Sequence, residues 1–389
     1  MSTALETRAE VIKLARVLGT PADQLRYLER ASPEDLRALR EQATDRLFEG
    51  DQDRLHKLAL ASRLLPASIG AVISRWALGA LLSARVTGLL VPSKAVDIAR
   101  HLPAAFLSDI AVELDPRRAR EVIERMPAWQ VADVAEELTR RNEYVAMGRF
   151  VGFLGDEAIS AAMTQIDDAG LLRIAFVMEG KDRLDHVVSL LPEERLAGVL
   201  HAADQGALWP EALDLLNHLG DERKGELSEI AAAEGLLDSL SEAANADGLW
   251  DLVLPVIPLM TESSRLSLAR LRVVEDRDAL AAILDTAGRY DLWAALLPIV
   301  DHLPAASRDI VATLAAGFDQ SVLERIVGIV RDGNMWSILL PLVALGPTLQ
   351  QRLVPVIAAL PATDRSRVAS TAGALGLVGR LGPLGSVLA

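Results

Sequence analysis

The sequence contains no cysteine among its 389 residues, and it is poor in aromatic residues. The absence of cysteine excludes disulfides, thiolate metal sites and cysteine nucleophiles. Aromatic residues are 4% of the chain and hydrophobic residues 51%, so the core must consist mainly of Leu, Ala, Val and Ile, a mixture that favours helices. Acidic residues outnumber basic ones by 54 to 40, and this net charge of −14 argues against a nucleic-acid-binding surface.

Motifs of known catalytic chemistry are also missing. No two of the six histidines are three or four residues apart, and the HExxH, G-x-S-x-G and GxxxxGK[ST] patterns do not occur. One polar cluster combines acid, base and imidazole within eight residues, and we interpret it as a solvated turn. The sequence therefore predicts a protein that is not an enzyme and has no cofactor and no metal site. The cluster consists of Glu179, Lys181, Asp182, Arg183, Asp185 and His186.

The first nineteen residues interleave charged and apolar positions, unlike a signal peptide, and predict a cytoplasmic location. The most apolar early stretch, Ile69 to Val91, holds Arg75 and Arg85, each of which would cost roughly 2.5 to 3.5 kcal/mol in a membrane. Its large residues follow a helical stripe, which predicts a buried helix with no transmembrane segment; peripheral contact with a membrane stays open as an alternative. The stripe is Ile69, Val72, Ile73, Trp76 and Ala80.

Four of the six tryptophans recur at a regular interval in the latter half of the chain. Each follows Leu or Met, and successive copies are 41, 43 and 43 residues apart. Apolar residues stand four and seven positions after each tryptophan, so the same apolar helical face recurs four times. The four tryptophans are Trp209, Trp250, Trp293 and Trp336.

A turn that contains Gly or Asn precedes each of these tryptophans, and prolines follow at the same spacing. Pro255, Pro298 and Pro341 stand five positions after a tryptophan, where Asp214 replaces proline in the first copy. Because a proline inside a helix removes a hydrogen bond, the helix should bend or split in the three later copies. Two further apolar helices fit between successive tryptophans, which is typical of armadillo and HEAT repeats.

The middle of the chain repeats on a shorter step. Leu102-Pro103 and Met126-Pro127 are 24 residues apart, with Asp115-Pro116 between them, and each proline suits a helix start. Since no segment alternates in the manner of a strand, the sequence predicts an all-α fold, an α-solenoid forming an elongated superhelix. We expect three parts: a helical segment at 1–92, a short-helix solenoid at 93–200 and armadillo-like repeats at 201–389.

Residues 93–168 resemble the cytoplasmic N domain of MgtE-type magnesium transporters. The resemblance rests on Leu114-Asp115-Pro116 with Ala119, Val122 and Ile123, which match a rhythm of the kind LPPERAAEVLAELDPE. It implies an α-solenoid of short helices and no transport activity, because a CBS pair and a set of transmembrane helices are missing. Acidic residues of that domain contribute to magnesium sensing. Their candidate counterparts are Asp109, Glu113, Asp133 and Glu136.

The C-terminal region is unusually apolar for the end of a repeat array. A single charge, Arg352, lies between Asn334 and Thr363, and five glycines follow in the tail. Terminal repeats normally present a polar face. Either the tail covers the last repeat, or the end is an exposed surface for a second copy, a protein partner or a membrane. The candidate interaction surface is Trp336, Leu339, Leu342, Val354, Leu377, Leu381 and Leu384.

These patterns favour a non-enzymatic scaffold or adaptor that binds a protein partner on its helical-repeat surface. Two alternatives stay open. The positive mean hydropathy of +0.24 suits a binder of an apolar small molecule or lipid within the superhelix. The transporter resemblance and the apolar C-terminus suit a membrane-proximal regulator.

Overall fold

The structure is a computed structural model that describes residues 3–49, 52–62 and 64–388. All regular secondary structure in these ranges is helical, which confirms the all-α class. The chain forms two compact units, Met1–Gly220 and Asp221–Ala389. The expected boundary near residue 200 lies inside a helix of the first unit, and the one after residue 92 lies at the start of a helix that packs on its neighbours.

The first unit is made of short helices. They are α1 (Thr3–Leu18), η1 (Ala22–Arg30), α2 (Pro33–Glu49), α3 (Gln52–Ser62), α4 (Ala67–Ile73), η2 (Ser74–Leu78), α5 (Gly79–Thr87), α6 (Pro92–Ala99), α7 (Ala104–Glu113), α8 (Arg120–Ile123), α9 (Ala128–Arg140), α10 (Tyr144–Phe150), η3 (Val151–Phe153), α11 (Asp156–Met163), α12 (Asp168–Val177), η4 (Lys181–Arg183), α13 (Leu184–Ser189), α14 (Glu193–Gln205) and α15 (Trp209–Leu216).

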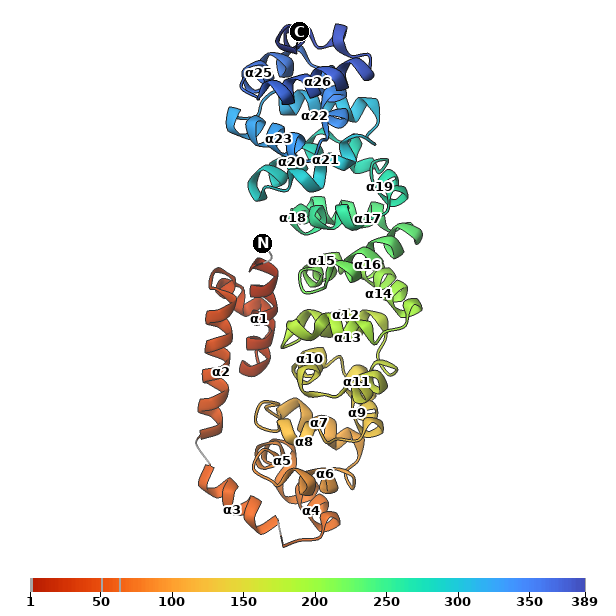
Figure 1. Cartoon of the computed structure of the whole chain (residues 1–389). Coiled ribbons are helices and arrows are strands. Elements are labelled where there is room, and N and C mark those ends of the chain that lie inside the picture. The colour runs from red at the N-terminus through yellow and green to blue at the C-terminus, as the bar shows by residue number, and fades with distance from the viewer. Residues whose placement is uncertain (1–2, 50–51, 63, 389) are drawn as a thin grey trace. The chain divides into compact units, whose positions relative to one another are not determined.

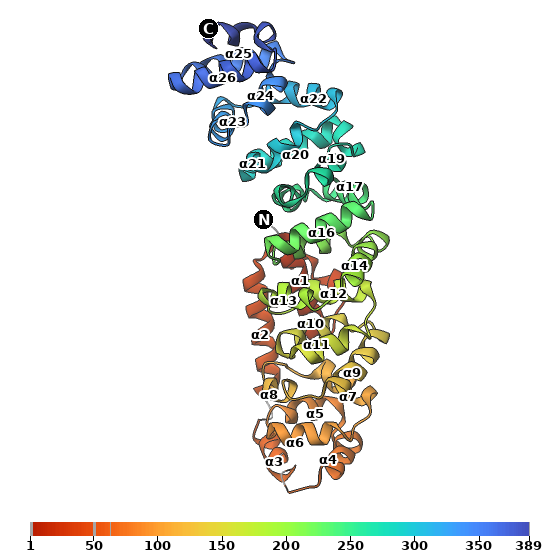
Figure 2. The same cartoon turned by 45° about the vertical axis from the view of Figure 1, so that its right-hand side comes forward.

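Most helices of the first unit pack against the helix two places along the chain. Thus α5 contacts α7, α7 contacts α9 and α9 contacts α11, while α10 contacts α12 and α12 contacts α14. Figures 1 and 2 show these helices following one another in chain order through the unit. Pro103 and Pro127 stand directly before α7 and α9, as expected, whereas turns follow Pro116 and α8 begins only at Arg120.

The N-terminal helix α1 packs against α10, α12 and α15, and it also contacts α2. A buried ion pair joins Lys13 to Glu10, and Arg40 of α2 lies 3.5 Å from Glu10 and 2.8 Å from Glu179. Burial alone would raise the pKa of Glu10, but Lys13, Arg40 and Arg37 together hold it below its ordinary value. These charges stabilise one another only while α1 and α2 stay in place, so they fix both helices on the unit.

The second unit follows the same principle with elements of similar length. They are α16 (Asp221–Ala233), α17 (Leu237–Asp247), α18 (Trp250–Val253), η5 (Leu254–Leu259), α19 (Glu262–Leu268), η6 (Arg272–Glu275), α20 (Arg277–Tyr290), α21 (Trp293–Val300), α22 (Ala305–Ala315), α23 (Gln320–Asp332), α24 (Trp336–Val343), α25 (Pro347–Ala358), α26 (Ala362–Ala374), η7 (Val378–Arg380), η8 (Gly382–Leu384) and α27 (Gly385–Leu388). Here α18 contacts α20, α20 contacts α22, α22 contacts α24 and α24 contacts α26.

One turn recurs before all four predicted tryptophans, and each tryptophan is buried as the first residue of its helix. The residue two positions before it has a positive φ, and the residue one before donates its N–H to a carbonyl five residues back at 2.8 Å. This is the hydrogen bond that closes a helix with a left-handed residue. The left-handed residues are Ala207, Gly248, Asp291 and Asn334; the bonds run from Leu208 to Ala203, Leu249 to Ala244, Leu292 to Ala287 and Met335 to Val330.

The same turn also occurs where no tryptophan follows: it ends α1 at Gly19, α9 at Asn142 and α16 at Gly235, and it recurs near the C-terminus at Gly376. Gly376 has a φ of +65°, and Leu377 donates to the carbonyl of Ala372 at 2.9 Å. Val378 stands where a tryptophan would, and it is exposed. Among the described residues this turn is therefore a general way of ending a helix, and a tryptophan follows it in four places.

The prolines after the tryptophans act differently in different copies. In the second copy the α-helix ends at Val253 and continues as the 3-10 helix η5, which holds Pro255 and Pro258. In the third and fourth copies Pro298 and Pro341 lie inside single eight-residue helices. The expected split is confirmed only at the second copy.

The stripe predicted to face the core at 69–80 faces solvent instead. Ile69, Val72 and Trp76 are 47%, 58% and 77% exposed, so the prediction of a buried face is wrong for them. The buried side of α4 consists of Gly70 and Ala71. These small residues let α4 approach α6 closely, because a Cβ on Gly70 would lie 3.0 Å from Cδ1 of Ile98.

Candidate functional site

An apolar cavity of about 250 Å³ lies inside the first unit. Its lining comes from η2 and from every α-helix between α5 and α13. An engineered cavity of about 150 Å³ with Leu, Ile and Phe walls is enough to bind benzene. The space in this unit is therefore large enough for a small apolar molecule or part of a longer one.

The lining of the cavity is almost entirely apolar. None of the residues that form it is charged, and the hydroxyl side chains among them are Ser74, Ser83 and Thr87. All three lie on η2 and α5, so the polar groups gather at one end of the lining. Ser83 donates to the carbonyl of Ser74 at 3.3 Å, and Thr87 donates to the carbonyl of Ser83 at 2.7 Å, which leaves their oxygens able to accept.

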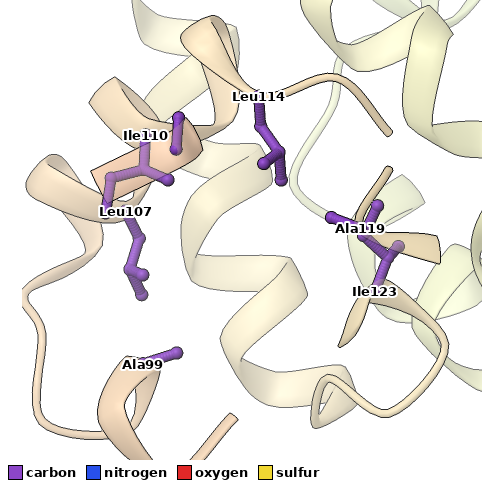
Figure 3. Packing of buried hydrophobic residues seen from close by; sticks show 7 residues of the cluster. Ala99, Leu107, Ile110, Leu114, Ala119 and Ile123 are labelled. Carbon is purple, nitrogen blue, oxygen red and sulfur yellow. The ribbon is translucent and has the colours of Figure 1, made fainter. Parts of the chain in front are cut away.

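Both small and large side chains line the cavity. The larger ones include Leu107 and Ile110 of α7, and the smaller ones include Ala99, Ala135 and Ala162 of other helices. Figure 3 shows a buried cluster that includes the lining residues Ala99, Leu107, Ile110, Leu114 and Ile123, with Ala119 beside them.

The size of the cavity sets an energy scale. At about 24 cal/mol for each Å³ of unfilled space, the contacts missing from 250 Å³ would cost about 6 kcal/mol. Total stabilities of domains are about 5 to 15 kcal/mol. A molecule that filled this space would therefore change the stability of the unit measurably.

A smaller apolar cavity lies in the second unit. It is lined by Trp250, Leu254 and Ile257 among others, and its volume of about 40 Å³ holds no more than a water-sized group. The candidate ligand site therefore belongs to the first unit.

The structure corrects the premise of the predicted C-terminal surface. Six of its seven residues are buried inside the second unit: Trp336 is 1% exposed, and Leu339, Leu342, Leu377, Leu381 and Leu384 are buried with it. Val354 is half-buried. The prediction that these residues form an exposed interaction surface is therefore wrong for these six.

The tail covers the last helices. Its elements η8 and α27 pack on α25, and α27 also packs on α26. The side-chain amide of Gln350 donates to the carbonyls of Val343 and Arg380, at 3.1 and 2.9 Å, and so ties the tail to the unit. The glycines permit this path because Gly376 and Gly382 both have positive φ.

The acidic residues taken from the transporter resemblance do not converge. Asp109 pairs with Arg141, while Glu113, Asp133 and Glu136 are exposed. In the part of the chain that the structure describes, no group of three or more His, Asp or Glu side chains is placed to hold a metal ion. Arg141 also binds Glu137, and these arginine contacts, with that of Arg140, lower the pKa of Glu137 to about 2.

The polar run at 179–186 holds the first unit together. Its side chains bind partners elsewhere in the unit and do not bind one another. Lys181 binds Asp214, the residue that replaces proline in the first tryptophan copy, and this carboxylate is fully buried. The pairs are Glu179 with Arg40, Lys181 with Asp214, Arg183 with the carbonyl of Gly152, Asp185 with the backbone N–H of Gly220, and His186 with Asp156.

Comparison with known proteins adds no assignment: no protein family, no curated protein and no solved structure matches the chain.

Proposed function

We propose that the chain is a non-enzymatic binding protein whose first unit holds an uncharged, elongated apolar molecule such as an acyl or isoprenoid chain. The observation that carries the proposal is the cavity, with its apolar lining and its hydroxyl groups confined to the η2–α5 end. An ionised head group inside would have no charged partner among the lining residues, so burying it would be strongly unfavourable. A hydroxyl or ester head group suits Ser74, Ser83 and Thr87.

We also propose a fold for the two units. Both would be solenoids of helical repeats, the second of armadillo or HEAT type and the first similar to the N domain of MgtE-type transporters. Packing between helices two apart in the chain and the recurring turn support it.

The proposal predicts that bound lipid survives purification. We expect native mass spectrometry of the full chain to show an added apolar mass that organic solvent releases. After delipidation, long-chain 1-alkanols should raise the melting temperature more than fatty acids of equal length. At 100 times the dissociation constant, the added stability would be about 2.7 kcal/mol. No retained mass and no shift with either series would refute ligand binding.

A protein-binding scaffold is the second candidate. The regular spacing of the four turns that precede a tryptophan favours it, since repeats at one interval would present equivalent surfaces. A scaffold needs no ligand. If the alkanol series has no effect, the scaffold becomes the better proposal.

A further inference from the structure

The first unit carries a row of large apolar side chains on its outside. We define the α4–η2 stripe as Ile69, Val72 and Trp76, which occupy positions i, i+3 and i+7 of a continuous helical run. All three are exposed, as are Leu64 just before the run and Leu81 just after it. A row at this spacing normally marks the buried face of a helix.

The opposite side of the same run is already packed. Gly70 and Ala71 are buried against α6, and Ser74 and Leu78 line the cavity. The run therefore carries apolar residues on both sides, and only the side with Gly70 and Ala71 is buried in the unit. A helix that is apolar all round is either buried in protein or in contact with lipid.

The segment that contains the stripe has the opposite charge to the chain as a whole. Residues 54–96 contain no Asp or Glu, although the chain has a net charge of −14. Basic residues attract the anionic head groups of lipids, by about fivefold in binding for each charge near the surface. The basic residues of this segment whose side chains the structure describes are Lys57, Arg75, Arg85 and Lys94.

The exposed tip of the stripe has the chemistry of a membrane interface. Trp76 is the most exposed of its three residues, and the guanidinium of Arg75 lies 5.2 Å from the centre of its ring. Tryptophan favours the level of the lipid head groups, where its ring is in apolar surroundings and its N–H meets water. An adjacent arginine reaches the phosphates from there.

We propose that the α4–η2 stripe docks the first unit on the surface of a membrane that contains anionic lipid. Figures 1 and 2 show α4 at one end of the first unit, where a flat surface has access to it. Docking does not require a ligand in the cavity. Because Ser74 and Leu78 of η2 belong to the lining, it also brings the polar end of the cavity next to the lipid.

The structure favours docking over insertion. By length and composition, Ala67–Thr87 is the one helix of the described residues long and apolar enough to cross a membrane. Its course breaks at Gly79, where φ is +71°, and α5 beyond the break packs on α3 and α7. Spanning would expose the buried Ala84 and Val86 contacts and carry Arg75 and Arg85 into the hydrocarbon.

The test is flotation of the delipidated full chain with vesicles of phosphatidylcholine alone or with about 30% phosphatidylglycerol. We expect binding to the anionic vesicles that weakens as salt is added. Trp76→Glu should reduce it about tenfold or more, because it removes the anchor and adds a negative charge. Arg75→Glu changes the charge by two and should reduce it about 25-fold.

Trp129→Glu is the matched control, since Trp129 is 58% exposed on α9 of the same unit but lies outside the stripe. It should bind as the unsubstituted chain does, and equal melting temperatures will show that all variants fold. Brominated lipid gives a second measurement: its quenching of tryptophan fluorescence should disappear in Trp76→Phe and persist in Trp129→Phe.

Three results would overturn the proposal. They are absence of binding to anionic vesicles, equal loss in the Trp76 and Trp129 variants, and membrane association that resists alkaline carbonate, which indicates a spanning segment. Dimerisation through Trp76 without vesicle binding would assign the stripe to a second copy instead. Since the chain is delipidated and no alkanol is added, failure here leaves the cavity proposal standing, and the reverse also holds.

Discussion

Filling the cavity of the first unit should stabilise the ligand-free chain and remove ligand binding. Ala135 of α9 and Ala162 of α11 are suitable positions, because both line the cavity, both are buried and their helices pack together. Leu at either position adds three carbons to the interior. At about 0.8 kcal/mol for each buried carbon, less up to about 1 kcal/mol of side-chain entropy, each substitution gains about 1.5 kcal/mol.

For a unit of this length, a gain of that size raises the melting temperature by roughly 3 to 6 °C. The assay is thermal unfolding of the delipidated chain followed by circular dichroism, with and without a long-chain 1-alkanol. Each cavity variant should melt higher than the unsubstituted chain without alkanol. Its further rise on adding alkanol should be smaller. The two substitutions are tested separately, since neighbouring sites do not add.

Ala203→Leu is the control. Ala203 in α14 is fully buried but does not line the cavity, so a larger side chain there overpacks the interior and costs about 1 to 3 kcal/mol. If Ala135→Leu and Ala162→Leu lower the melting temperature as this control does, the space is not there. The ligand proposal then loses its basis.

Further predictions concern the turns, caps and buried charges. Gly248→Ala should destabilise the second unit by about 1 kcal/mol in urea unfolding, because the φ of Gly248 is +67°. Ala207→Gly, at the same position before its tryptophan and with a φ of +50°, should be neutral or stabilising. A loss of stability in both variants would contradict this reasoning. Asp276→Ala should cost about 1 kcal/mol in the same assay, since its carboxylate caps α20 by accepting from two backbone N–H groups at 2.7 and 3.0 Å. The folded state lowers the pKa of Glu10, so its stabilising effect is present above its unfolded pKa and is lost as the pH falls through the folded value. The difference in melting temperature between the unsubstituted chain and Glu10→Gln should therefore shrink between pH 7 and about pH 3, and a constant difference would refute the assignment.

The recurring turn was predictable because its interactions are local. A tryptophan, the left-handed residue two positions before it and an acceptor carbonyl four positions further back all lie within seven residues. The spacing of Trp209, Trp250, Trp293 and Trp336 therefore identifies four copies. The copies at Gly19, Asn142, Gly235 and Gly376 were not predicted because no tryptophan follows them, although each keeps the hydrogen bond of the turn.

The direction in which an apolar face points was not predictable in the same way. The spacing of Ile69, Val72 and Trp76 places them on one side of a helix, and their size suggested the core side. The small residues Gly70 and Ala71 on the other side permit a closer approach to α6, so that side is buried instead. How closely α4 approaches α6 depends on the shape of both helices, and the periodicity of one segment carries no information about its neighbour.

The sequence by itself therefore determined the helical class and the turns before the tryptophans, since these follow from composition and from contacts within a few residues. Only the tertiary structure decided that the C-terminal tail covers Leu381 and Leu384, that the stripe at 69–76 faces outward, and that residues far apart in the chain line a common cavity. Each of these depends on how much volume several separate helices leave between them. That volume is a sum over the distances between helices, and no single segment of the sequence specifies it.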